Sequence, residues 1–497
     1  MTSRHLWLAG VAMAALSWPA TASAQEDVAA RIQALEAQVQ ALSQQIADLK
    51  AATSGQIQTV RDEAASEKQA AATTAAKSAK VTIANGKPTI ASADGRFSAT
   101  VHGVMQLDTA KYFQDDNLPA SVTARDLSGG ANFRRARLGV DGKLFGDFDY
   151  NVLLDFGGSG AEDTGRVHEL WLQYTGFDAV KLKVGAFPPS LGLADAASTN
   201  GALFPERPAV TEIARGLAGG DTRIGAGISA GGERWLASAA VTGALVSSFN
   251  SGATAFNSPV FDEQLGYTLR FAGTPLKGDD WLVHAGANAS VIVQPADAGA
   301  AAATRYPVQL RERPELRVDG TRLVDTGAID AAGARALGFE LAFQKKNLLF
   351  QGEYFDLRVD RRNPAAGLTD PKFSGWYLEG GWVLTGEARK YNTATAAFDA
   401  PAVAKPLDPS KDQWGAWELA ARYSTLDLGS HENSVVVADR IRGGEQSIWT
   451  FGVNWFPNPA VKFMVDVQDV SIKRRNAAGL PLGQDYQTMN LRSQFAF

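Results

Sequence analysis

The chain has 497 residues and no cysteine, 45% of its residues are hydrophobic, and its formal net charge is −5. The hydrophobic content excludes a mostly disordered chain, and the lack of cysteine excludes a disulfide scaffold, a thiolate zinc site and a cysteine nucleophile. A mean hydropathy of −0.14 without an apolar run of about 18 residues excludes a bundle of membrane-spanning helices, and the small charge does not suggest nucleic acid as a partner.

The first 24 residues are expected to be a secretory signal peptide. Arg4 and His5 precede an apolar run from Leu6 to Leu16, and Ala22–Ala24 supplies the small residues of a cleavage site. The alternative is a short core helix. The signal peptide predicts export from the cytoplasm.

Residues 25–52 carry apolar side chains with a period of 3.5, which predicts a short coiled-coil helix that pairs with copies of itself. The spacing alternates between four and three along Val28, Ile32, Leu35, Val39, Leu42, Ile46 and Leu49. An amphipathic helix packed on its own domain is the alternative, and this stripe does not fix the number of chains. Residues 53–94 are rich in Ala, Ser, Thr, Gln and Lys, and are predicted to be a linker.

From residue 95 to 497 the hydrophobic period is 2, which predicts β-strands with one apolar and one polar face. Most of the segments have about ten residues, the length with which a tilted strand crosses a bilayer. The sixteen segments are 97–108, 135–144, 148–156, 167–175, 179–187, 220–230, 234–243, 264–272, 281–290, 336–344, 347–357, 373–385, 414–424, 446–457, 460–472 and 486–497.

Short and long connections alternate between these segments, as in outer-membrane barrels. One connection, 386–413, falls on the short-turn side although it is long. Tryptophans gather near the strand ends, where indole rings favour the boundary of water and lipid. The sequence therefore predicts an all-β, 16-stranded antiparallel transmembrane β-barrel over 95–497. A soluble β-sandwich would explain the period, but not the alternation of connections.

Four segments carry a family resemblance: Phe133–Phe145, Leu384–Arg389, Gly415–Tyr423 and Gly452–Pro459. They resemble the phosphate-selective porins O and P, and the matches extend from about residue 95 to 497. The resemblance implies a homotrimer of 16-stranded barrels among the lipids of a Gram-negative outer membrane. It further implies that each barrel is a separate pore, which passes small anions and is narrowed by loops folded inward.

Strand parity places ten basic and eleven acidic side chains on the lumen face, so the wall is balanced and most of these charges are expected to form cross-strand pairs. Parity also turns Phe133 toward the lumen and His168 toward lipid. The candidate pore-lining or anion-binding residues are Arg135, Arg137, Lys181, Lys183, Arg207, Arg215, Arg311, Arg313 and Arg317.

Any anion preference must then come from a local cluster, and residues 305–322 hold five arginines against three acids. This segment resembles the arginine-bearing inward loop of the family; a solvated outer loop is the alternative. The 188–219 loop is the expected constriction. Asp149 and Asp195 occupy positions where strict phosphate pores of the family are expected to have lysines, and this departure argues against high-affinity phosphate selection.

No enzyme is predicted. Residues 227–231 match the G-x-S-x-G pattern, but they lead into another strand rather than a helix. The five histidines are scattered, so neither a metal nor a cofactor is expected. The predicted function is a passive porin for small anions and small solutes. A general or sugar-type porin, and a structural tether acting through the N-terminal coiled coil, are the alternatives.

Overall fold

The computed structural model describes residues 26–84, 86–114, 126–158, 165–220, 222–246 and 264–497. The predicted signal peptide, 1–24, lies outside these residues. The chain divides into two compact units, with the boundary between Ser78 and Ala79. Among the described residues, no helix is long and apolar enough to cross a membrane.

The first unit contains one helix, α1, which runs from Glu26 to Lys77. It includes the predicted helix and continues through residues 53–77, so this part of the range predicted as a linker is helical. Alanine, glutamate, glutamine and lysine dominate this stretch and are strong helix formers, even though they present no apolar stripe. The apolar side chains from Ile32 to Leu49 are between 51% and 66% exposed.

The second unit begins with a hairpin of β1 (Lys80–Ala84) and β2 (Lys87–Ala91). This hairpin also lies within the range predicted as linker. Strand β2 pairs antiparallel with the first barrel strand, with Thr89 opposite Thr100. The segment that precedes the barrel is thus joined to its sheet.

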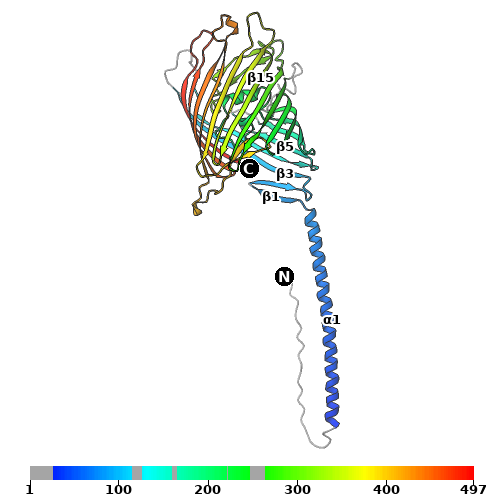
Figure 1. Ribbon diagram of the computed structural model, residues 1–497. Helices are drawn as coiled ribbons and strands as arrows, with labels where there is room; N and C mark the ends of the chain where they lie inside the picture. The colour runs from blue at the N-terminus through cyan, green and yellow to red at the C-terminus, as the bar shows by residue number, and fades with distance from the viewer. Residues whose placement is uncertain (1–25, 85, 115–125, 159–164, 221, 247–263) are drawn as a thin grey trace. The chain divides into compact units, whose positions relative to one another are not determined.

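Sixteen antiparallel strands form the barrel, and the last pairs with the first, with Tyr486 opposite Gln114, so that the sheet closes (Figure 1). Each predicted segment overlaps one of these strands, and the predicted 16-stranded antiparallel barrel is confirmed. The strands are β3 Ser98–Gln114, β4 Gly130–Leu144, β5 Phe148–Asp155, β6 Arg166–Tyr174, β7 Val180–Phe187, β8 Arg223–Gly231, β9 Trp235–Leu245, β10 Leu265–Lys277, β11 Trp281–Gln294, β15 Ile329–Lys345, β16 Leu348–Arg361, β17 Lys372–Val383, β20 Ala416–Ser430, β21 Ile441–Asn458, β22 Val461–Lys473 and β23 Asp485–Ala496.

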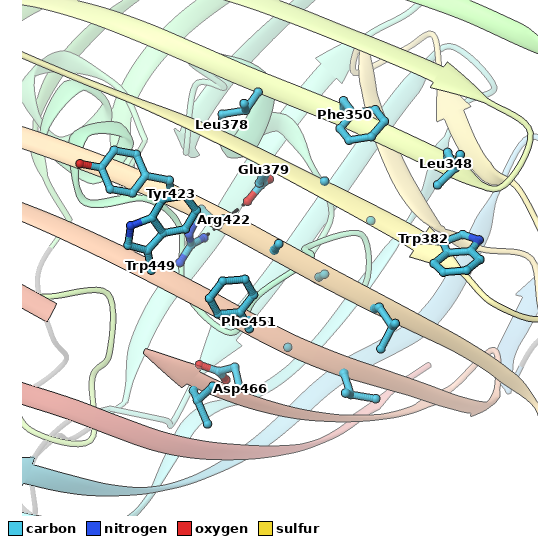
Figure 2. Close-up of a pocket in the computed structure, with 18 of the residues that line it drawn as sticks. Leu348, Phe350, Leu378, Glu379, Trp382, Arg422, Tyr423, Trp449, Phe451 and Asp466 are labelled. Carbon is cyan, nitrogen blue, oxygen red and sulfur yellow. Dashed lines mark ion pairs between the residues drawn. The ribbon is translucent and has the colours of Figure 1, made fainter. Parts of the chain in front are cut away.

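Alternate side chains of these strands face outward and are apolar. Figure 2 shows Phe350, Tyr423 and Phe451 on the outer face, around an apolar hollow of about 960 Å³. Glu379 and Arg422, which stand opposite each other on β17 and β20, point inward and form an ion pair at 3.6 Å. Apolar side chains toward lipid and charges toward the lumen are what a transmembrane barrel requires.

The long connection on the short-turn side contains a hairpin of β18 (Arg389–Asn392) and β19 (Ala397–Pro401), followed by the short 3-10 helix η2 (Pro409–Lys411). Arg389 is buried and donates to both carboxylate oxygens of Glu418, at 2.7 and 2.6 Å. The carbonyls of Thr395 and Ala396, at the hairpin tip, accept hydrogen bonds from the inward-facing Arg270 of β10. The connection is long because this hairpin enters the lumen.

The 188–219 loop also lies in the lumen and contains α2 (Leu193–Ala196) and α3 (Ala209–Ala218). The 295–328 connection contains β12 (Pro307–Val308), β13 (Arg311–Glu312) and β14 (Val324–Asp325). Apolar side chains of α3 and of this connection share one buried cluster with β15, β16, β17, β20, β21 and β22. The 3-10 helix η3 (Val437–Asp439) lies between β20 and β21.

Wall cations hold the backbone of the 188–219 loop in place. The Lys462 ammonium donates to the carbonyl of Ala202 at 2.6 Å, and Arg422 donates to that of Glu206 at 2.9 Å. Arg492 donates to the carbonyl of Pro205. These bases face inward as strand parity predicts, but they are buried under the loop rather than lining an open path.

Candidate functional site

Two adjacent cavities lie in the lumen along β4 to β10, and both are bounded by Pro188 and Ser190 of the 188–219 loop. The first, of about 330 Å³, we call the arginine chamber; its charged lining is Arg134, Arg135, Arg137, Arg166, His168, Glu169, Asp195, Arg207, Glu212, Arg215 and Arg317. The second, of about 300 Å³, we call the lysine chamber; its side chains include Gln173, Lys181, Lys183, Phe187, Ser229, Leu236, Ser238, Thr268 and Arg270.

Several arginines of the arginine chamber are neutralised by carboxylates. Arg137 donates to Asp155 at 2.9 Å, and Arg215 donates to Asp195 at 2.6 Å. Glu212, at the start of α3, accepts from Arg215, Arg207 and Arg317 at 3.2, 3.3 and 2.9 Å; it therefore joins arginines from two different loops.

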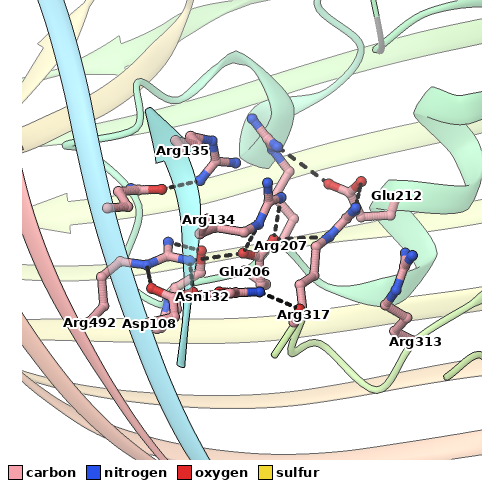
Figure 3. Close-up of polar contacts among 12 residues, drawn as sticks. Asp108, Asn132, Arg134, Arg135, Glu206, Arg207, Glu212, Arg313, Arg317 and Arg492 are labelled. Carbon is pink, nitrogen blue, oxygen red and sulfur yellow. Dashed lines mark hydrogen bonds and ion pairs between the residues drawn. The ribbon is translucent and has the colours of Figure 1, made fainter. Parts of the chain in front are cut away.

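Glu206 is the centre of a buried cluster beside the chamber (Figure 3). It accepts from Arg134 at 2.6 and 2.9 Å and from Arg492 at 2.9 Å, and Arg317 lies 3.4 Å away. Burial by itself would raise the pKa of Glu206, but the charges of Arg134, Arg492 and Arg317 outweigh burial and hold that pKa well below its ordinary value. The carboxylate therefore fixes the loop to the wall in its ionised form.

Arg135 differs from its neighbours because no carboxylate among the described residues lies within ion-pair distance of it. Its side chain is 7% exposed and donates through Nη1 to Gln106 Oε1 at 2.6 Å. Its Nε is buried without a hydrogen-bond partner in the described part of the chain. An uncompensated guanidinium with free donors in a narrow cavity can bind an anion.

The structure brings seven of the nine candidate residues to the two chambers. Lys181 and Lys183 line the lysine chamber, while Arg135, Arg137, Arg207, Arg215 and Arg317 line the arginine chamber. Arg311 is exposed on β13 and lines neither. Arg313 lines neither as well, and it donates to the carbonyl of Gly320 at 3.0 Å.

Two β-bulges add basic side chains that strand parity misses. The pairing of β3 with β4 shifts register at Arg134, which turns Arg134 inward and leaves Phe133 56% exposed on the outer face. The pairing of β5 with β6 shifts at His168, which lines the arginine chamber. The predicted orientations of Phe133 and His168 are therefore wrong, because a bulge reverses the alternation at one residue.

In the lysine chamber, the ammonium of Lys183 lies 4.0 Å from the ring centroid of Trp171 and 5.5 Å from that of Phe187. Arg270 forms the far side and is paired with Glu340 at 2.9 and 2.7 Å. The tip of the β18–β19 hairpin closes the chamber across from the wall.

A closed barrel of sixteen antiparallel strands, apolar outside, charged inside and narrowed by inward loops, defines an outer-membrane porin. Residues 109–497 match the family described as phosphate-selective porin O and P, and the chain belongs to that family. The fold and the family point to a channel rather than an enzyme.

The chain is similar to two proteins and to one solved structure. Porin O of Pseudomonas aeruginosa is 28% identical over 400 residues, which cover 75% of this chain and 83% of that protein. A protein of Caulobacter vibrioides is 27% identical over 383 residues, covering 76% of this chain and 69% of its own length. The solved structure of an anion-selective porin from Comamonas acidovorans is 11% identical with a TM-score of 0.48, and covers 80% of this chain and 99% of that one.

Proposed function

We propose that this porin is a passive diffusion channel for small anions, phosphate or related, and for other small solutes, through an arginine-bearing constricted lumen. The observation that carries the proposal is Arg135, whose buried guanidinium faces the arginine chamber without a carboxylate partner among the described residues. Fixed donors in a narrow and poorly screened passage favour anions, and a guanidinium stays charged and can grip two oxyanion oxygens.

The charge around the chamber supports the same proposal. Seven arginines and three carboxylates line it, and two more carboxylates, Asp155 and Glu206, pair with these arginines from behind the lining. A small positive excess remains. Asp195, which replaces an expected lysine, is paired with Arg215 at 2.6 Å, and this supports a moderate anion preference rather than tight phosphate binding.

The test is the single-channel conductance of the purified protein, together with its reversal potential in a potassium chloride gradient. We expect a reversal potential that shows anion preference, and a chloride current that phosphate reduces weakly. A cation-preferring pore would overturn the proposal. A pore without ion preference that passes sugars in a liposome-swelling assay would establish the general or sugar-type porin instead.

We propose further that the protein is exported after cleavage at Ala24 and assembles as a homotrimer in which the α1 helices form a coiled coil. The exposed apolar stripe from Ile32 to Leu49 supports self-association. With 52 residues the helix is about 78 Å long, and this length also suits a tether between the outer membrane and another layer.

Removal of residues 25–78 tests this division of the chain. We expect a folded, heat-modifiable barrel, because a closed barrel satisfies its own backbone hydrogen bonds. Crosslinking before and after the deletion then shows whether α1 contributes to the oligomer. Loss of barrel formation in the truncated chain would contradict the division, and N-terminal sequencing of the mature protein checks the cleavage site.

A further inference from the structure

We propose that the lysine chamber is a binding site for small organic carboxylates with an apolar or aromatic body. This inference rests on the proposed anion channel and names a class of solute that binds in one of its two chambers. It is carried by three features of the chamber: unpaired ammonium groups, a row of hydroxyl groups and an apolar wall.

The ammonium groups belong to Lys181 and Lys183, which stand two residues apart on the inner face of β7. Lys181 is exposed, and neither lysine forms an ion pair with a carboxylate of the described residues. Trp171 and Phe187 flank the Lys183 ammonium, at 4.0 and 5.5 Å from their ring centroids. Aromatic faces hold a cation in position without neutralising its charge, so both lysines can still attract an anion.

The two carboxylates closest to these lysines are engaged elsewhere. Glu169 accepts hydrogen bonds from Asn151 at 2.9 Å and from the Trp171 indole at 2.6 Å. Asp149 pairs with Lys143 at 2.7 Å. Neither carboxylate is among the residues that line the chamber.

A row of four residues crosses the chamber wall on adjacent strands. Lys181 stands opposite Ser229, Ser229 opposite Ser238, and Ser238 opposite Arg270. The hydroxyls of Ser229 and Ser238 have no hydrogen-bond partner among the described residues. A carboxylate whose first oxygen meets the Lys181 ammonium can therefore accept a second hydrogen bond from the neighbouring hydroxyl.

The lining also includes an apolar patch, which lies next to polar side chains such as Gln173. Phe187, Pro188, Leu236 and Ala240 contribute to it. Inorganic phosphate and chloride gain nothing from such a wall, whereas an apolar body is favoured in proportion to the surface that it removes from water. A volume of about 300 Å³ lies at the lower end of the range for small-molecule sites, so the ligand is small.

The experiment measures how benzoate, acetate and phosphate reduce the chloride current of the full-length protein in planar bilayers. Benzoate and acetate carry the same carboxylate and differ in their apolar body. We expect half-block by benzoate at a concentration at least about tenfold lower than by acetate. Equal potency of benzoate and acetate would overturn the inference.

Three variants locate the site. Lys181→Gln should raise the half-blocking concentration of benzoate about five- to tenfold and leave phosphate within about twofold. Leu236→Ser should weaken benzoate but not acetate. Arg311→Gln, which removes one positive charge from an exposed residue outside both chambers, is the control and should leave benzoate within about twofold. Wild-type benzoate block in Lys181→Gln would overturn the inference.

The two proposals fail separately. If the wild-type reversal potential shows anion preference but benzoate is no better than acetate, the carboxylate site is refuted while the anion channel stands. If the wild type has no anion preference, but benzoate blocks strongly and Lys181→Gln removes the block, the anion channel is refuted while the carboxylate site stands.

Discussion

The buried and uncompensated guanidinium of Arg135 should contribute more to anion preference than any paired arginine. Replacing it by glutamine removes one positive charge and keeps a side chain that can still bond to Gln106. An anion about 6 Å from the guanidinium, in a medium with an effective dielectric constant of about 40, is stabilised by about 1.4 kcal/mol. This corresponds to about tenfold in local anion concentration. Screening by mobile ions reduces the effect, because the Debye length is about 8 Å at physiological salt.

We therefore expect Arg135→Gln to lower the permeability ratio of chloride to potassium by about three- to tenfold, as measured by the reversal potential in a salt gradient. Arg311→Gln is the charge-matched control, because Arg311 is exposed and lies outside both chambers. It should change the ratio by less than about 1.5-fold. An unchanged ratio in Arg135→Gln, or equal effects of the two substitutions, would refute the role given to the unpaired guanidinium.

Three other predictions use the same preparation. Arg317→Gln should lower the permeability ratio, whereas Arg313→Gln should not, because only Arg317 lines the arginine chamber; equal effects would mean that the 295–328 connection is placed differently. In this cysteine-free chain, Leu138→Cys should react only with lipid-soluble reagents and Arg137→Cys with small aqueous ones; equal labelling of both would contradict the strand register. A carboxyl whose pKa is lowered on folding stabilises the fold fully above its unfolded pKa, about 4.3 for glutamate, and this contribution is lost only as the pH falls through the lower folded pKa. Glu206 should therefore stay ionised at pH 4 as at pH 7, so Glu206→Gln should have a higher conductance than the wild type at both pH values; a wild-type conductance that reaches that of Glu206→Gln at pH 4 would contradict this role.

The barrel could be predicted from the sequence because its constraint is local. Each strand must alternate between lipid and lumen, so a period of 2 is visible without knowledge of the partner strands. The strands from Ser98 to Ala496 follow this rule closely enough for all sixteen to be located. The long connection 386–413 was also visible as an exception, but its cause, a hairpin that enters the lumen, depends on contacts such as that of Arg389 with Glu418.

The candidate site was less predictable, because its geometry depends on bulges and on long-range contacts. A bulge is one extra residue in one strand, and the sequence near Arg134 and His168 contains no signal for it. The predicted orientation of Phe133 is wrong for that reason. Likewise, residues 305–322 appear as one arginine-rich cluster, yet only Arg317 reaches a chamber, since the path of a connection is decided by packing against α3.

The number of charges on the lumen wall does not determine ion selectivity, because some wall cations bind the inward loop and others face the cavities. Arg422, Lys462 and Arg492 donate to backbone carbonyls of the 188–219 loop. These three side chains are buried beside carboxylates or under the loop. They therefore position the loop, but they are not exposed to a solute in the lumen. Arg135 and Lys181 face the cavities that remain. Strand parity places ten bases and eleven acids on the lumen wall. This nearly even number is compatible with local anion preference, because a solute meets only those cations that the loops leave uncovered.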